Sequence, residues 1–158
     1  MKSIKKIIIP AVLALFVIIQ FFGVTPNVSV VPSENSIEKH YSVPSEVQQI
    51  LTASCYDCHS NNTVYPWYSK VQPVKWWLAS HINDGKRHLN FDEFNTYSND
   101  KKLHKLDEIT ETVKAGEMPL KSYTLIHTGA KLSEKQKQQI IGWAKSVKES
   151  FNEKNPEQ

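Results

Sequence analysis

Apolar residues recur every three or four positions in several stretches of the chain, and each stretch predicts a helix. Three of these stretches run from about residue 44 to 58, from about 74 to 85, and from about 100 to 115. Asn99 can cap the start of the third, and Gly116 stands where a left-handed residue ends a helix. No repeat and no alternation of apolar and polar residues is evident, so the pattern predicts an all-α fold.

The last predicted helix has the clearest signals. Ser133 followed by Gln136 resembles a capping box, in which each residue satisfies a backbone N–H of the other. An apolar stripe at helical spacing follows, made of Ile140, Trp143 or Ala144, Val147 and Phe151. We therefore expect this helix to lie against the core along most of its length.

A longer apolar run near the N-terminus has a different character. It extends from Ile7 to Val24 without a charged side chain, and three lysines precede it. As a helix, eighteen residues would span roughly 27 Å, slightly less than the hydrocarbon core of a bilayer. The run ends in Gln-Phe-Phe-Gly-Val without the small residues of a cleavage site, which favours a retained anchor over a cleaved signal peptide. The lysines predict a single pass through the cytoplasmic (inner) membrane, with the rest of the chain on the periplasmic side.

The remaining sequence predicts one domain of ordinary size. We expect a signal anchor or transmembrane segment over 1–24, a linker over 25–43, a helical domain over 44–151 and a polar tail over 152–158. The composition, 40% hydrophobic and 22% charged, is that of a folded globular protein. The net charge of +3 comes from the three N-terminal lysines, because the chain after them carries sixteen basic and sixteen acidic residues. A chain that is neutral beyond its N-terminal lysines argues against a nucleic-acid partner.

The candidate chemistry lies in Cys55-Tyr56-Asp57-Cys58-His59, which holds the only two cysteines of the chain. The spacing C-x-x-C-H is that of covalent attachment of a c-type haem. On one helix, Cys55, Cys58 and His59 would fall within an arc of about 100°, so that they could address one planar ligand together. The sulfurs would form thioethers with the two vinyl groups, and the imidazole would bind the iron.

Three other uses of two cysteines fit less well. A zinc site needs two further ligands, and the remaining histidines form no paired H-x₃₋₅-H unit. A thioredoxin-like redox pair expects a β-α-β context, and a plain disulfide would leave His59 unexplained. We therefore predict one haem c, covalently bound through Cys55 and Cys58.

On these residues the chain resembles a bacterial family of small exported haem-binding domains related to class I cytochromes c. The resemblance covers about residues 45–145 and includes CYDCH, an aromatic and polar middle (YPWY, KWWLASHINDGKRHLNF), a GEMP segment and a terminal LSEKQKQQIIGWAK helix. It implies a cytochrome c-like helical domain around one covalent haem, and it implies the cofactor more firmly than a physiological role.

Met118 is the expected second axial ligand. It is the only methionine besides Met1, its thioether suits iron, and Pro119 stiffens its loop. In class I cytochromes c a Met-Pro before the last helix supplies this ligand, which Met118 matches in order. His81 is the alternative distal ligand, followed by His127, and a structural core methionine is the other interpretation of Met118.

Several further residues are candidates for the haem pocket. Nine of the 16 aromatic residues lie between Tyr56 and Tyr97, which suits a large flat ligand. Among them Trp67 and Trp77 are the predicted pocket residues, and Arg87, the only arginine, could hold a haem propionate. A backbone carbonyl of the Pro66 or Pro73 loop is expected to orient the Nδ1 proton of His59.

Together these features predict a membrane-anchored periplasmic monohaem cytochrome c that transfers single electrons. Its expected partners are redox proteins, the cytochrome c maturation machinery and the membrane. No side-chain constellation for catalysis stands out, so an enzyme is not expected. The alternative is a haem-based ligand-binding or sensor module, or a bis-histidine haem protein without a carrier role.

Overall fold

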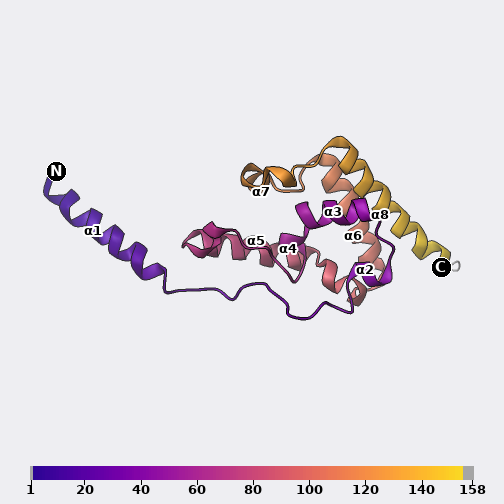
Figure 1. Cartoon of the computed structure of the whole chain (residues 1–158), viewed down its shortest axis with the longest axis horizontal. Coiled ribbons are helices and arrows are strands. Elements are labelled where there is room, and N and C mark those ends of the chain that lie inside the picture. Colours follow the sequence, from indigo (N-terminus) through magenta and orange to yellow (C-terminus); the bar gives the residue numbers. More distant parts are fainter. Residues whose placement is uncertain (1, 155–158) are drawn as a thin grey trace.

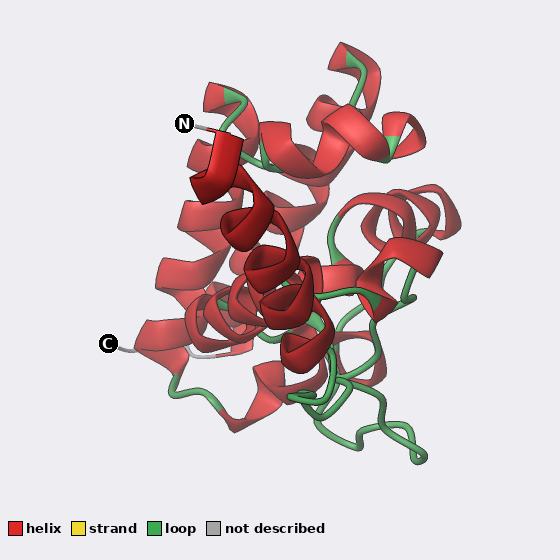
Figure 2. Ribbon diagram, turned by 90° about the vertical axis from the view of Figure 1, so that its left-hand side faces the viewer, coloured by secondary structure: helices red, strands yellow, loops and turns green. Residues whose placement is uncertain are grey.

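A computed structural model of the chain describes the backbone of residues 2–154 and the side chains of residues 4–151. Within these residues the secondary structure is helical, and the only β-pairing is an isolated bridge between Val28 and Asn62 (Figures 1 and 2). The predicted all-α class is confirmed. Residues 155–158 of the predicted polar tail lie outside the described chain.

Two long helices, α6 (Asn99–Ala115) and α8 (Glu134–Lys154), lie against one another and form the framework of the domain (Figure 1). The predicted capping box of α8 is present, because Gln136 N–H donates to Ser133 Oγ and Ser133 N–H donates to Gln136 Oε1. Gly116 ends α6 with a φ of 71°, as predicted. The N-terminal cap of α6 is Ser98 rather than Asn99, since the Ser98 hydroxyl accepts from Lys101 N–H.

The predicted helix over 44–58 is divided in two. α3 (Ser45–Ser54) ends at Cys55, whose φ of −127° and ψ of −44° leave the helical path, and the short α4 (Tyr56–His59) follows. The Cys55 carbonyl then accepts from the N–H groups of Cys58 and His59, which closes a tight turn around the motif. Cys55, Cys58 and His59 are therefore arranged by a break between two helices and not by the 100° steps of a single helix.

The second predicted helix is present as α5 (Val74–His88), which begins as expected and continues one turn past Gly85. Five short elements were not predicted by the apolar pattern, because each is too short to show a period: α2 (Ile37–His40), η1 (Trp67–Lys70), η2 (Phe91–Thr96), α7 (Lys121–Ile126) and η3 (Thr128–Ala130).

The main apolar core lies where α3, α6 and α8 meet η2 and α2. Phe94, Leu51 and Ile140 are completely buried there, and Ile37 of α2 joins them. The predicted stripe of α8 contributes Ile140, Trp143, Ala144, Val147 and Phe151. Residues 25–43, predicted to be a linker, thus supply a core residue and lie on the domain.

The N-terminal apolar run forms α1 (Lys2–Ile19), which extends away from the other helices (Figure 1). Its apolar side chains from Ile4 onward are largely exposed. The helix ends five residues before Val24, the predicted end of the membrane-spanning segment. In the part of the chain that the structure describes, no helix is long and apolar enough to cross a membrane.

Candidate haem site

A cavity of about 680 Å³ lies between the α4–α5 side of the domain and the α6–α7 side. This volume falls in the range of about 300–1,000 Å³ that is usual for small-molecule and cofactor sites. Its walls are mainly apolar and include Leu51, Leu89, Phe91, Ile109 and Val113. Five of the six residues considered for haem attachment or ligation line it: Cys55, Cys58, His59, Met118 and His81.

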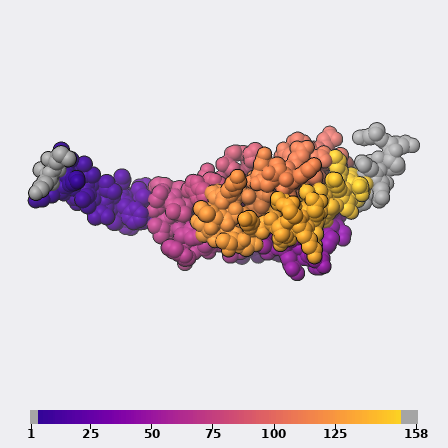
Figure 3. All heavy atoms as spheres, turned by 90° about the horizontal axis from the view of Figure 1, so that it is seen from above, coloured from indigo at the N-terminus to yellow at the C-terminus, as the bar shows by residue number. Residues whose placement is uncertain are grey.

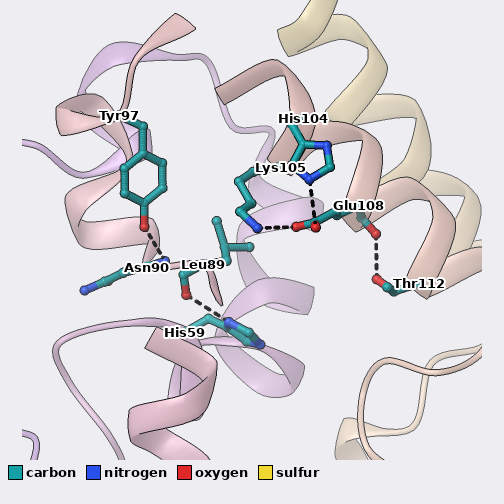
Figure 4. Close-up of polar contacts among 8 residues, drawn as sticks. All are labelled: His59, Leu89, Asn90, Tyr97, His104, Lys105, Glu108 and Thr112. Carbon is teal, nitrogen blue, oxygen red and sulfur yellow. Dashed lines mark hydrogen bonds and ion pairs between the residues drawn. The ribbon is translucent and has the colours of Figure 1, made fainter. Parts of the chain in front are cut away.

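His59 is held by a hydrogen bond that fixes its tautomer. Its Nδ1 lies 2.9 Å from the carbonyl oxygen of Leu89, so Nδ1 carries the proton and Nε2 keeps a lone pair (Figure 4). Burial lowers the pKa of His59, although the backbone carbonyls of Leu89 and Gly85 act in the opposite direction. A neutral imidazole with a free Nε2 is the form that binds a metal.

The carbonyl that orients His59 was expected from the Pro66 or Pro73 loop, and this expectation is wrong. α5 is longer than predicted, and Leu89 at its C-terminal end carries the carbonyl to His59. Sequence reasoning missed Leu89 because a backbone acceptor leaves no signature in the side-chain pattern.

Gly85 allows α5 to approach the C-x-x-C-H turn. A Cβ at this position would lie 2.6 Å from the carbonyl oxygen and 3.1 Å from the Cβ of Cys58. Any larger residue would therefore force the two segments apart. The sequence analysis assigned Gly85 to a helix end, whereas its role is to permit this contact.

Cys55 and Cys58 are free thiols, and both face the cavity. Burial raises the pKa of Cys55 to about 12 and that of Cys58 to about 11, with smaller contributions from Cys58 and Asp57 respectively. The unmodified thiols are therefore protonated at neutral pH and are poor ligands for a free metal ion. Within the described residues, no group of three or more His, Cys, Asp or Glu side chains could hold a metal ion.

Met118 reaches the cavity from the loop after α6. Gly116 turns the chain, and the N–H groups of Glu117 and Met118 both donate to the Thr112 carbonyl. Met118, Pro119, Leu120 and Tyr123, from this loop and from α7, then form one part of the wall. Met118 and His59 thus enter the cavity from different segments, as two axial ligands would.

The two rival histidines differ in their surroundings. His81 lines the cavity, but its Nδ1 lies 3.0 Å from the Trp77 carbonyl and its ring packs on Trp77 at 4.2 Å. His127 does not line the cavity. It stacks on Tyr123 at 4.3 Å and shares a 2.5 Å hydrogen bond with the Tyr68 hydroxyl.

Three predicted pocket residues are not brought to the cavity. Trp67 and Trp77 are 79% and 47% exposed, and Arg87 extends into solvent, where it pairs with Asp84 at 2.7 Å. The density of aromatic residues in this segment was a correct observation, but it carried no information on which way each ring faces.

Lys105, which the sequence analysis missed, is a basic side chain on the cavity wall, where Arg87 was expected. Lys105 is the only lysine or arginine among the lining residues, and its side chain is only 11% exposed. Its Nζ pairs with Glu108, which also contacts His104 (Figure 4). Burial raises the pKa of Glu108, but the hydrogen bond and charge of Lys105 act against it and leave that pKa below its usual value. The signal in the sequence was a lysine in register with Leu106, Ile109 and Val113 on the inner face of the third helix.

Asp57, one of the two spacer residues of the motif, connects the C-x-x-C-H turn to α7. One carboxylate oxygen accepts from the Tyr123 hydroxyl at 2.7 Å, and the other accepts from Val64 N–H at 2.9 Å. Burial raises the pKa of Tyr123, and the hydrogen bond to Asp57 adds to this effect. The tyrosine therefore keeps its proton and remains a donor.

The residues around the cavity fit a covalently bound haem. They offer two thiols, an imidazole with a free Nε2, a thioether from another segment and apolar walls. Comparison with known protein families matches residues 14–146 to the haem-binding domain. Neither the curated proteins nor the solved structures gave a match. Because the match covers most of the chain, this protein belongs to the haem-binding domain family.

Proposed function

We propose that this haem-binding protein is a monohaem c-type cytochrome that transfers single electrons between partner proteins. The observation that carries the proposal is the convergence of Cys55, Cys58, His59 and Met118 on one cavity. A bound haem supplies a one-electron Fe(III)/Fe(II) couple. The chain itself contributes attachment, axial ligands and a mainly apolar environment that limits access of water.

The attachment residues would act by thiol addition. Each S–H adds across one vinyl double bond, so that the sulfur bonds to one carbon, the hydrogen goes to the other, and nothing is oxidised. His59 would bind the iron through Nε2, because the Leu89 carbonyl keeps the proton on Nδ1. Met118 is the proposed distal ligand, and a soft thioether in this position favours ferrous iron and raises the reduction potential.

Lys105 is the proposed partner of a haem propionate. The other ionisable groups on the cavity wall include four carboxylates, those of Asp57, Asp84, Glu108 and Glu111, which would repel a bound propionate. Among the described lining residues Lys105 is the one permanent cation. It could release Glu108 and bind the propionate instead, or pair with both carboxylates.

We also propose that α1 and the residues after it anchor the protein in the cytoplasmic membrane, with the domain on the outer side. The exposed apolar side chains of α1 and the lysines before them support this location. The cytochrome c maturation machinery, which attaches haem outside the cytoplasm, is then an obligatory partner.

The test is expression of the full chain together with the maturation machinery. We expect one haem per chain that survives a denaturing gel and gives the pyridine haemochrome spectrum of two thioether links. A colourless product with both thiols free to alkylate would contradict the proposal.

Axial ligation is tested separately. The oxidised protein should show the near-infrared sulfur-to-iron band, and Met118→Ala should abolish it, whereas His81→Ala should leave it unchanged. The position of His81 on the cavity wall favours one alternative, a bis-histidine haem protein or a ligand-binding module. In that case the near-infrared band is missing from the start, and rapid binding of carbon monoxide to the native ferrous protein identifies the ligand-binding form.

A further inference from the structure

Three of the four tryptophans lie on the surface at one end of the domain. Trp67 is 79% exposed, and Trp76 and Trp77 are more than one-third exposed, whereas Trp143 is buried in the core. Exposed tryptophans on adjacent segments are unusual for a surface that faces only water. The indole ring, with an apolar body and one N–H, is enriched where a membrane meets water.

These tryptophans belong to a continuous segment that we call the tryptophan patch. It comprises the exposed apolar residues of η1, of the connection that follows and of the start of α5, namely Trp67, Val71, Val74, Trp76 and Trp77. Lys70 and Lys75 lie among them, and no acidic residue occurs between Asp57 and Asp84. The patch is therefore apolar and cationic, in a chain whose residues after the three N-terminal lysines carry no net charge.

Hydrogen bonds connect the patch directly to the end of α1. Gln72, almost completely buried, donates its backbone N–H to Gln20 Oε1 at 2.9 Å and its side-chain amide to the Phe22 carbonyl at 2.7 Å. The Trp76 indole N–H donates to the same carbonyl at 2.9 Å. Figure 3 shows the indigo helix ending against the magenta part of the domain that contains the patch. No spacer separates the apolar helix from the tryptophans.

We infer that the tryptophan patch rests on the anionic phospholipid surface of the membrane in which α1 is anchored. The inference depends on the anchoring proposed above and adds a fixed contact between the domain and the lipid headgroups. A bilayer is favoured over a protein partner because the patch continues the exposed apolar surface of α1 through Phe21 and Phe22. Its lysines suit lipid phosphates, and the Lys75 ammonium lies beside Gly23, at the end of the apolar run.

The experiment uses the full, haem-loaded chain in nanodiscs of phosphatidylglycerol and phosphatidylethanolamine in equal parts. A small fraction of the lipid carries a photoactivatable diazirine close to the glycerol backbone, and crosslinked residues are identified by mass spectrometry. We expect crosslinks in residues 67–77 as well as in α1, and none above background in α8.

A charge-reversed pair tests the contribution of the lysines. In Lys70→Glu/Lys75→Glu, crosslinking of residues 67–77 should fall at least about tenfold, since one lysine beside an anionic surface is worth about fivefold in binding. The matched control, Lys114→Glu/Lys145→Glu, changes two exposed lysines of α6 and α8 and should leave the crosslinks unchanged. Circular dichroism establishes that both variants are folded.

The outcomes distinguish the lipid contact of the tryptophan patch from the membrane anchoring by α1 on which it depends. Crosslinks confined to α1 would overturn the inference and keep the anchor, and they would leave the patch free for a protein partner. A chain that does not stay with the nanodiscs would overturn both. A fall in crosslinking that is equal in the two charge-reversed variants would also contradict a role for this particular surface.

Discussion

The two sides of the cavity are built differently. The side formed by α3, α6 and α8 belongs to the main apolar core, where Leu106, Ile140 and Ala144 are almost completely buried. On the other side, α5 has one buried residue, Ile82, which is not part of that core, and α7 has none. Hydrogen bonds hold this second side, among them Tyr123 to Asp57 and Tyr68 to His127.

This difference indicates that the cofactor completes the structure. Apolar burial supplies most of the free energy that stabilises a fold, whereas a single hydrogen bond contributes about 1 kcal/mol net. The α6–α8 side should therefore fold on its own packing, while the α5–α7 side should depend on a large apolar ligand in the cavity.

Loss of haem attachment should have the largest effect. In Cys55→Ala/Cys58→Ala no haem survives a denaturing gel, and we expect the free energy of unfolding to fall by about 4 kcal/mol, the contribution of a ligand present at a thousand times its Kd. Hydrogen exchange should accelerate in α4, α5 and α7 and remain slow in α6 and α8. Uniform acceleration over all helices would remove the distinction between the two sides.

Truncation of a side chain in the main core should destabilise mainly the α6–α8 side of the cavity. Leu106→Ala opens a cavity among residues of the main core and should lower the free energy of unfolding by about 3 kcal/mol in urea titration. The absorption spectrum of the haem should stay unchanged. Ile82→Ala is the counterpart on α5, and we expect it to alter the spectrum more than Leu106→Ala does.

Gly85→Ala should destabilise the contact between α5 and the C-x-x-C-H turn. The new Cβ would lie 2.6 Å from the Cys58 carbonyl oxygen, so the free energy of unfolding should fall by about 2 kcal/mol. Gly142→Ala is the control, because Gly142 is also in a helix but a Cβ added there would meet no other segment within 4 Å. That variant should be stabilised by up to about 1 kcal/mol from helix propensity. Equal effects of the two substitutions would show that α5 does not need this close approach.

Tyr123→Phe removes one hydrogen bond of the α5–α7 side. It leaves one Asp57 oxygen without its donor and should cost about 1 kcal/mol. Hydrogen exchange should accelerate locally in residues 121–127. Tyr97→Phe, which removes a hydroxyl that accepts from Asn90 N–H near the core, should leave these residues unaffected.

The smallest expected effect concerns the charge beside the haem. Lys105→Met should favour ferric iron by a few-fold, which corresponds to a potential lower by about 30 mV, since tenfold is 59 mV for one electron. Lys102→Met is the matched control, because Lys102 is a buried lysine of the same helix that bonds Asn95 and does not line the cavity. Equal reduction potentials in the two variants would contradict the proposed contact between Lys105 and a haem propionate.

The sequence predicted best what depends on local signals. Gly116 predicts the C-terminal end of α6, and Ser133 with Gln136 predicts the start of α8. Both signals act between residues that are close in the sequence. The meeting of Cys55, Cys58 and His59 at one cavity could be predicted from the C-x-x-C-H spacing, while their role in haem attachment stays a prediction. The direction of Trp67 and the carbonyl of Leu89 could not be predicted, because they depend on how separate segments pack.

Both spacer residues of the C-x-x-C-H motif, Tyr56 and Asp57, make hydrogen bonds to distant segments of the chain. The Tyr56 hydroxyl donates to Glu38 of α2, while Asp57 accepts from the Tyr123 hydroxyl of α7. Two remote segments therefore close over the motif in the finished structure. For the covalent attachment proposed above, a maturation enzyme would act before these segments pack over the motif, so we expect the porphyrin to be attached to an open chain and the polypeptide then to fold around it.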